Sequence, residues 1–148
     1  MKLEKQVGVI PMQIKLSVIL LLLAPVFVSA SSVADKTSLY FVSPRNGTVV
    51  DNPVTVVFGL SGPYVIVPAG VVQEFAGHHH LLIDTELPDL ALPIPNNENH
   101  RHFGGGQTEV VLELSPGEHR LQLLLGDFAH IPHKPPVISE PIKITVRE

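Results

Sequence analysis

Residues 77–84 read GHHHLLID, three consecutive histidines at the start of a short apolar run. Successive side chains of a β-strand point to opposite faces, so a strand here carries imidazoles on both of its faces. His79 then shares a face with Leu81, whereas His78 and His80 point to the other face. Three adjacent imidazoles are a poor way to build a hydrophobic core and a common way to build a ligand site. We interpret this strand as the element around which both the fold and the site are organised.

Four of the other five histidines are also grouped. His100 and His102 lie two residues apart, so an extended segment points both imidazoles to one side. A loop stiffened by Pro132 can present both His130 and His133. We predict that the fold brings these two pairs to the same end as the histidine strand. The candidate metal ligands are therefore His78, His79, His80, His100, His102, His130 and His133.

The sequence predicts an all-β fold. The chain contains 14 prolines and, beyond residue 30, no sustained apolar period of 3.6 residues, which leaves little room for long helices. Short β-branched or alternating segments are instead separated by turn signals such as Asn46-Gly47. We interpret the segments as an antiparallel β-sandwich. The expected strands are 38–43, 54–60, 77–84, 109–114, 118–126 and 138–146, with short apolar pieces at 64–67 and 71–72.

The order of these segments resembles a bacterial immunoglobulin-like domain. SPRNGTVVDNPVTVVF at 43–58 is similar to its first two strands, and ELSPGEHRLQLLLGD at 113–127 resembles its strands E and F. In such a sandwich the start of strand C, the start of strand E and the F–G loop lie at one end, which gathers the three histidine groups. Asp127, at that end, either orients or ligates an imidazole or only caps a turn. His119 and Asp84 belong to the opposite end.

The first 30 residues are typical of a cleaved signal peptide. Three lysines precede the apolar run 16–28, and Val28-Ser29-Ala30 offers the small residues that signal peptidase needs. The run reaches roughly 20 Å, short of the ~30 Å hydrocarbon core that an uncleaved anchor must cross. Met12 is an alternative start. We expect a periplasmic or secreted protein, free of the membrane after cleavage, with a signal peptide at 1–30, a linker at 31–37 and one domain at 38–148.

The expected mature domain is acidic and free of cysteine. The chain has 10 Lys and Arg and 14 Asp and Glu, and removing three Lys and one Glu with the signal peptide leaves 7 and 13, a formal charge of −6. This balance, without a basic stripe, argues against nucleic acid and against anionic membrane surfaces. Since no disulfide can form, the core alone must hold the domain together.

The donor types favour a zinc or copper(II) ion. The sequence has no cysteine, and its two methionines lie in the predicted signal peptide, so a cuprous or blue-copper site lacks its soft ligands. We expect no organic cofactor. Gly104–Gly106 is not followed by the Lys-Ser/Thr of a phosphate-binding loop, and it more simply lets the backbone pass close to the histidines. Arg101 should point away from a bound cation.

Three interpretations stay open at this point. In the first, the histidines bind a metal passively, with an affinity that falls below about pH 6.5, where free histidine protonates. In the second, they only order the proline-rich loops of a cell-envelope interaction module, in which Phe103, Phe128 and Ile131 face a protein or glycan partner. In the third, a metal-dependent enzyme, no recognised catalytic motif is present and no spacing recommends a Ser-His-Asp trio.

Three stretches taken together resemble a known bacterial family. GHHHLLID at 77–84, HRHFGGGQTE at 100–109 and PGEHRLQLLLGDFAHIPHKPPVISEPI at 116–142 are similar to the domain-of-unknown-function 4399 family. The resemblance extends over about residues 41–146. It implies a small exported protein in which the three stretches act as one unit, and it implies neither an activity nor a metal.

Overall fold

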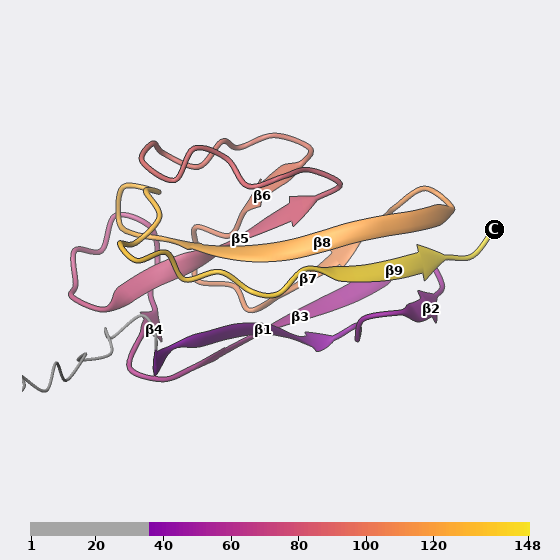
Figure 1. Ribbon diagram of the computed structural model, residues 1–148, viewed down its shortest axis with the longest axis horizontal. Helices are drawn as coiled ribbons and strands as arrows, with labels where there is room; N and C mark the ends of the chain where they lie inside the picture. Colours follow the sequence, from indigo (N-terminus) through magenta and orange to yellow (C-terminus); the bar gives the residue numbers. More distant parts are fainter. Residues whose placement is uncertain (1–35) are drawn as a thin grey trace, which may run out of the picture.

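The computed structural model describes residues 36–148, and all of the regular elements in this part of the chain are β-strands (Figure 1). The predicted signal peptide and nearly all of the predicted linker lie outside the described residues. No helix among residues 36–148 is long and apolar enough to cross a membrane. The strands are β1 (Ser38–Ser43), β2 (Thr48–Val50), β3 (Val54–Ser61), β4 (Val65–Ile66), β5 (Ala76–Ile83), β6 (His100–His102), β7 (Glu109–Leu112), β8 (Gly117–Gly126) and β9 (Ile142–Val146).

The strands form two sheets. The smaller has the order β1-β3-β7, and the larger has the order β2-β9-β8-β5-β4, with β6 also paired to β5. The histidine strand β5 therefore lies inside the larger sheet, with β8 along one edge and the short strands β4 and β6 along the other. Figure 1 shows the smaller sheet below the larger one, and the segment between β5 and β6 on the far side of the larger sheet.

Both faces of β5 are covered, which explains why all eight of its residues are buried. Leu81 and Ile83 face the core between the sheets, to which β3, β8 and β9 contribute alternate apolar residues. On the other face, Leu82 packs with Leu124 and Ile94 in a second, smaller core. Ile94 comes from the proline-rich segment 85–99, so this segment acts as a cover over the outer face of the sheet.

The prediction of an all-β fold is confirmed, and the prediction of purely antiparallel pairing is wrong at two short strands. β2 pairs parallel with β9, and β4 pairs parallel with β5. After β1 the chain passes to the larger sheet through a turn, in which the Gly47 N–H donates to the Lys143 carbonyl and the Asn46 side chain accepts from the Lys143 N–H. The predicted strand 138–146 begins only at Ile142, because Ile138 makes a single isolated bridge to Leu124.

Candidate metal centre

Four imidazoles lie together on the outer face of β5. His78 and His80 come from β5, His102 from β6 and His130 from the loop after β8, and their ring centroids are 4.6 to 6.0 Å apart. His78, His80 and His102 each offer one nitrogen, and these three atoms lie within 4.8 Å of one another. We call these four residues the histidine cluster.

Strand register places the first three rings. His78 and His80 are two residues apart on one strand and therefore share a face. β6 runs antiparallel to β5, with His102 directly opposite His80. Residues directly opposite one another in an antiparallel pair point to the same face, so His102 joins the two histidines of β5.

A short loop held by Asp127 places the fourth ring. One oxygen of the Asp127 carboxylate, Oδ1, accepts from the backbone N–H of Ala129 at 2.8 Å and of Ile131 at 2.9 Å. His130 between them has a φ of 66°, in the left-handed region that few residues other than glycine adopt. Two roles were predicted for Asp127, and these hydrogen bonds show that it caps the turn. The cap fixes the main chain on both sides of His130.

Two glycines leave room for the rings. A Cβ at Gly104 would lie 2.3 Å from Cε1 of His102, and a Cβ at Gly126 would lie 2.9 Å from Nε2 of His80. Real Cβ atoms do not approach other heavy atoms so closely. The expectation that the glycines after His102 let the backbone pass close to a histidine is therefore confirmed at Gly104.

Burial keeps the rings of β5 uncharged at neutral pH. Burial lowers the pKa of His78 to about 4, and repulsion by His102 and His130 adds to this effect. Burial lowers the pKa of His80 to about 3, with repulsion from His78 as the next cause. Burial also lowers the pKa of His102. Since neutral imidazole is the form that coordinates metals, these rings need lose no proton before they bind an ion.

The cluster contains imidazole nitrogens that the protein itself leaves without partners. Nε2 of His78 and Nε2 of His80 are hydrogen-bond partners only of each other, at 3.2 Å. Nδ1 of both rings and Nε2 of His102 are buried and make no hydrogen bond within the described part of the chain. Buried polar atoms in proteins are nearly always paired, so three neighbouring imidazoles that each keep an unpaired nitrogen favour a ligand. The donors fit a zinc or copper(II) ion, because every one of them is an imidazole nitrogen.

The family model described as "Domain of unknown function (DUF4399)" matches residues 56–147. The chain belongs to the DUF4399 family. The matched stretch contains all eight histidines of the chain, which confirms the resemblance seen in the three motifs. Neither the curated proteins nor the solved structures contain a match to this chain.

The other three candidate histidines of the DUF4399 domain lie outside the cluster. His79 faces the main core, where its ring is 5.1 Å from that of Phe58 and its Nδ1–H donates to the Gln107 carbonyl. His133 packs on Tyr64 at 4.7 Å, and its Nε2 lies 3.0 Å from the position of a Cβ at Gly77, on the same face as His79. Strand alternation predicts this separation for His79, whereas no sequence signal separates His133 from His130.

His100 lies on the outer face of the sheet, next to the cluster. It is directly opposite Leu82 on β5, and its Nδ1–H donates to the Asn97 side chain at 3.1 Å. Its Nε2 is buried without a partner, but within residues 36–148 no ring contact joins it to the four clustered histidines. Arg101, between His100 and His102, is exposed and on the alternate face of β6, as a cation next to a metal site should be.

His119 and Asp84 lie at the opposite end of β5 and β8, as predicted, and together with Ser115 they superficially resemble a catalytic trio. Nδ1 of His119 is 2.6 Å from Oδ2 of Asp84, and Nε2 is 3.4 Å from the Ser115 hydroxyl. The same Nε2, however, donates to the Ser115 carbonyl at 2.8 Å. Although burial alone would lower the pKa of His119, the Ser115 carbonyl and the Asp84 carboxylate raise it. Both ring nitrogens of His119 therefore face oxygen acceptors, so neither is free to accept a proton from the Ser115 hydroxyl as the general base of such a trio must.

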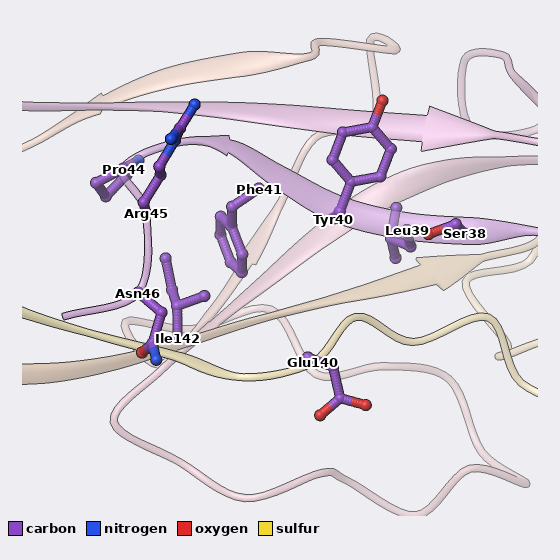
Figure 2. Close-up of a pocket in the computed structure, with 9 residues that line it drawn as sticks. All are labelled: Ser38, Leu39, Tyr40, Phe41, Pro44, Arg45, Asn46, Glu140 and Ile142. Carbon is purple, nitrogen blue, oxygen red and sulfur yellow. The ribbon is translucent and has the colours of Figure 1, made fainter. Parts of the chain in front are cut away.

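Two further surface features bear on the predicted sites. A cavity of about 290 Å³ lies between β1 and the start of β9, where Figure 2 shows Arg45 and Glu140 pointing away from each other. Its lining contains no histidine, so it is separate from the cluster. Phe103, expected on a docking surface, is instead buried in the main core against Phe58. Its N–H still donates to the His79 carbonyl of β5, so strand alternation points its ring to the face opposite His102. That part of the interaction-module prediction is wrong.

Proposed function

We propose that this DUF4399 protein is an exported binding protein for a divalent transition metal, copper(II) or zinc, held by His78, His80 and His102. The observation that carries the proposal is the convergence of three buried or half-buried imidazoles, each with a nitrogen within 4.8 Å of the other two. These residues come from two strands and are 24 positions apart in the sequence, so the fold itself assembles the group.

The spacing within the cluster supports coordination. For metal–nitrogen bonds of about 2.0 Å, two ligands of a tetrahedral ion are separated by about 3.3 Å. The Nε2 atoms of His78 and His80 are 3.2 Å apart. The lowered pKa values also change the expected pH dependence, because protons compete with the ion at His78 and His80 only near pH 4 and below.

We also propose that the domain is an immunoglobulin-like sandwich and that residues 1–30 direct it to the periplasm or outside the cell. The first proposal is supported by the passage of the chain from β1, paired with β3, to β2, paired parallel with β9. The second is supported by the basic and then apolar composition of the leader.

Metal titration tests the proposed function. The full chain, purified without a histidine tag, is titrated with zinc and copper(II) in a calorimeter, alongside His80→Ala and, as a control at the other end of the sheet, His119→Gln. We expect binding of one ion per chain with a Kd well below about 100 μM. We expect His80→Ala to weaken binding at least about 10-fold and His119→Gln to leave it unchanged. Binding no tighter than about 100 μM, or equal losses in both variants, would refute the proposal.

A second candidate function, an envelope interaction module, is favoured by one observation. Phe128 and Val72 are 46% and 76% exposed and line the same cavity, of about 380 Å³, at the histidine end. This candidate predicts that His80→Ala lowers stability equally with and without metal, and that Phe128→Ser abolishes binding to a protein or glycan of the envelope.

A further inference from the structure

We infer that His130 supplies the fourth ligand of the ion, so that the protein itself fills the coordination sphere, and that Asp127 is the residue that positions His130. This inference rests on the metal binding proposed above and adds what kind of metal site it is. Structural and storage sites for zinc are closed by four protein groups, whereas catalytic sites keep one position for water or substrate. The fourth ligand therefore distinguishes a protein that retains an ion from one that uses it for catalysis.

The position of the His130 ring supports this role. Its centroid is 4.6 Å from that of His102, 4.9 Å from that of His78 and 6.0 Å from that of His80. The planes of His130 and His78 are inclined by 77°, and those of His130 and His102 by 63°. The ring thus lies beside the strand-borne imidazoles, on a separate segment of the chain. It is outside the group whose nitrogens lie within 4.8 Å of one another, so it must turn toward the ion to become the fourth ligand.

The main chain at His130 is fixed by more hydrogen bonds than a surface loop requires. Besides the two bonds to the Asp127 carboxylate, the His130 N–H donates to the Asp127 carbonyl at 3.0 Å and the Asp127 N–H donates to the Ile131 carbonyl at 2.9 Å. The Ile94 N–H donates to the His130 carbonyl at 2.8 Å, which joins the loop to the cover segment 85–99. A left-handed conformation at a residue other than glycine has an energetic cost, and such conformations persist at functional sites where the surroundings determine them.

Asp127 acts on the site through the backbone. Its Oδ1 accepts two backbone N–H groups, so this oxygen is engaged in the turn. The side chain of asparagine keeps the same oxygen acceptor, and that of alanine removes it. Asp127→Asn should therefore preserve the position of His130, whereas Asp127→Ala should release it.

Azide binding to the copper(II)-loaded full chain tests the inference. Azide coordinates copper(II) strongly only where the protein leaves an equatorial position open, and it then produces an intense charge-transfer absorption band. We expect no band in the wild type, in Asp127→Asn or in His100→Ala, which removes the imidazole next to the cluster. We expect a band in His130→Ala, together with a roughly 10- to 100-fold lower copper affinity, and a weaker band in Asp127→Ala. Circular dichroism and thermal melting establish that each variant is folded.

The outcomes separate this inference from the proposed function. A wild type that binds copper and gives the same azide band as His130→Ala would overturn the closed site and leave metal binding intact. A wild type that binds no copper would refute the proposed function itself. If His130→Ala binds no copper, Asp127→Ala is the variant that tests the inference. It keeps the imidazole of His130 and loses only the carboxylate hydrogen bonds that hold the loop. An azide band in that variant supports the inference, and its absence there overturns the role of Asp127.

Discussion

Gly104 and Gly126 both border the histidine cluster, because each lies where a single added methyl group would overlap an imidazole. Both glycines have ordinary negative φ angles, in contrast to Gly106 and Gly117. Glycine is therefore needed at these two positions to leave space for the imidazole rings, and not to allow a left-handed backbone conformation. At this scale the position of each ring depends on the absence of a neighbouring side chain.

Gly104→Ala should weaken metal binding without unfolding the domain. The new Cβ would lie 2.3 Å from Cε1 of His102, and the ring, at the end of a rotatable side chain, would move out of its present position. We expect a loss of affinity of about 10-fold or more, as is typical when the support of a ligand is disturbed. The measurement is calorimetric titration with zinc, together with the melting temperature.

Gly105→Ala is the matched control. A Cβ there would meet only the flexible side chain of Gln107, at 3.1 to 3.2 Å. We expect this variant to bind zinc within about twofold of the wild type. Equal losses of affinity in the two variants would show that the loop as a whole, and not the space next to His102, determines binding.

The sequence alone identifies the candidate residues but cannot choose among them. Alternation along the strand places His79 away from His78 and His80, because a strand has only two faces. His130 and His133 are both within one short loop, and which of them turns toward the cluster depends on the hydrogen bonds of Asp127 and on the left-handed backbone at His130. Neither feature has a sequence signature of its own.

The segment 85–99, between β5 and β6, acts as a structural element although it forms no regular strand. It supplies Ile94 to the second core and a backbone N–H to the His130 carbonyl. Its prolines and asparagines are typical of a loop. They do not reveal that the loop covers the sheet, because only Leu90 and Ile94 of the segment pack against the second core, too few apolar residues to give a periodic pattern.

Ile94→Ala should destabilise the domain through this cover. Ile94 is 5% exposed and packs against Leu82 and Leu124, so truncation leaves a cavity. We expect a loss of about 2 to 3 kcal/mol in the free energy of unfolding, at the lower end of the range for such truncations because the cluster is small. Leu92→Ala, at a site that is 57% exposed, should change it by less than about 0.5 kcal/mol. Urea unfolding measures both, and similar values for the two would contradict a packed cover.

β6 illustrates why some strands can be predicted from the sequence and others cannot. β3, β8 and β9 have alternating apolar residues over five or more positions, and the sequence predicts each of them. β6 has only His100, Arg101 and His102, with no apolar residue, and it forms because β5 offers an edge there. A strand that depends on its neighbour rather than on its own composition cannot be recognised from the sequence.

At the scale of the whole molecule, the metal-free protein should become less stable in mild acid. Burial is the main cause that lowers the pKa of His78 and His79 to about 4 and of His80 to about 3. Below pH 6.5 these residues take up protons in the unfolded chain but not in the folded one, so stability falls with pH between about 6.5 and 4. Each contributes on the order of 1 kcal/mol per pH unit. Urea unfolding at pH 7, 6 and 5 measures the trend, and constant stability across this range would contradict it.

The pKa of His119 is shifted in the opposite direction, so this residue provides a control for that experiment. Its pKa is raised, so its contribution to stability is complete below pH 6.5 and is lost as the pH rises through the raised value. In His119→Gln the gain in stability that the wild type makes as the pH falls toward 6.5 should therefore be absent, whereas the loss between pH 6.5 and 4 should match that of the wild type. Zinc at about 100 times its Kd should add about 2.7 kcal/mol at pH 7.

The ligands proposed for the ion are spread widely along the chain, with 22 residues from His80 to His102 and 28 from His102 to His130. An ion bound by all three would cross-link these segments and close two loops, in a chain that has no cysteine with which to do so. For covalent cross-links, loops of this length correspond to roughly 3 kcal/mol of lost chain entropy in the unfolded state. The supply of metal would then stabilise this protein in the way that an oxidising environment stabilises a protein with disulfide bonds. In both cases the cross-linked chain unfolds less often and is less accessible to proteases.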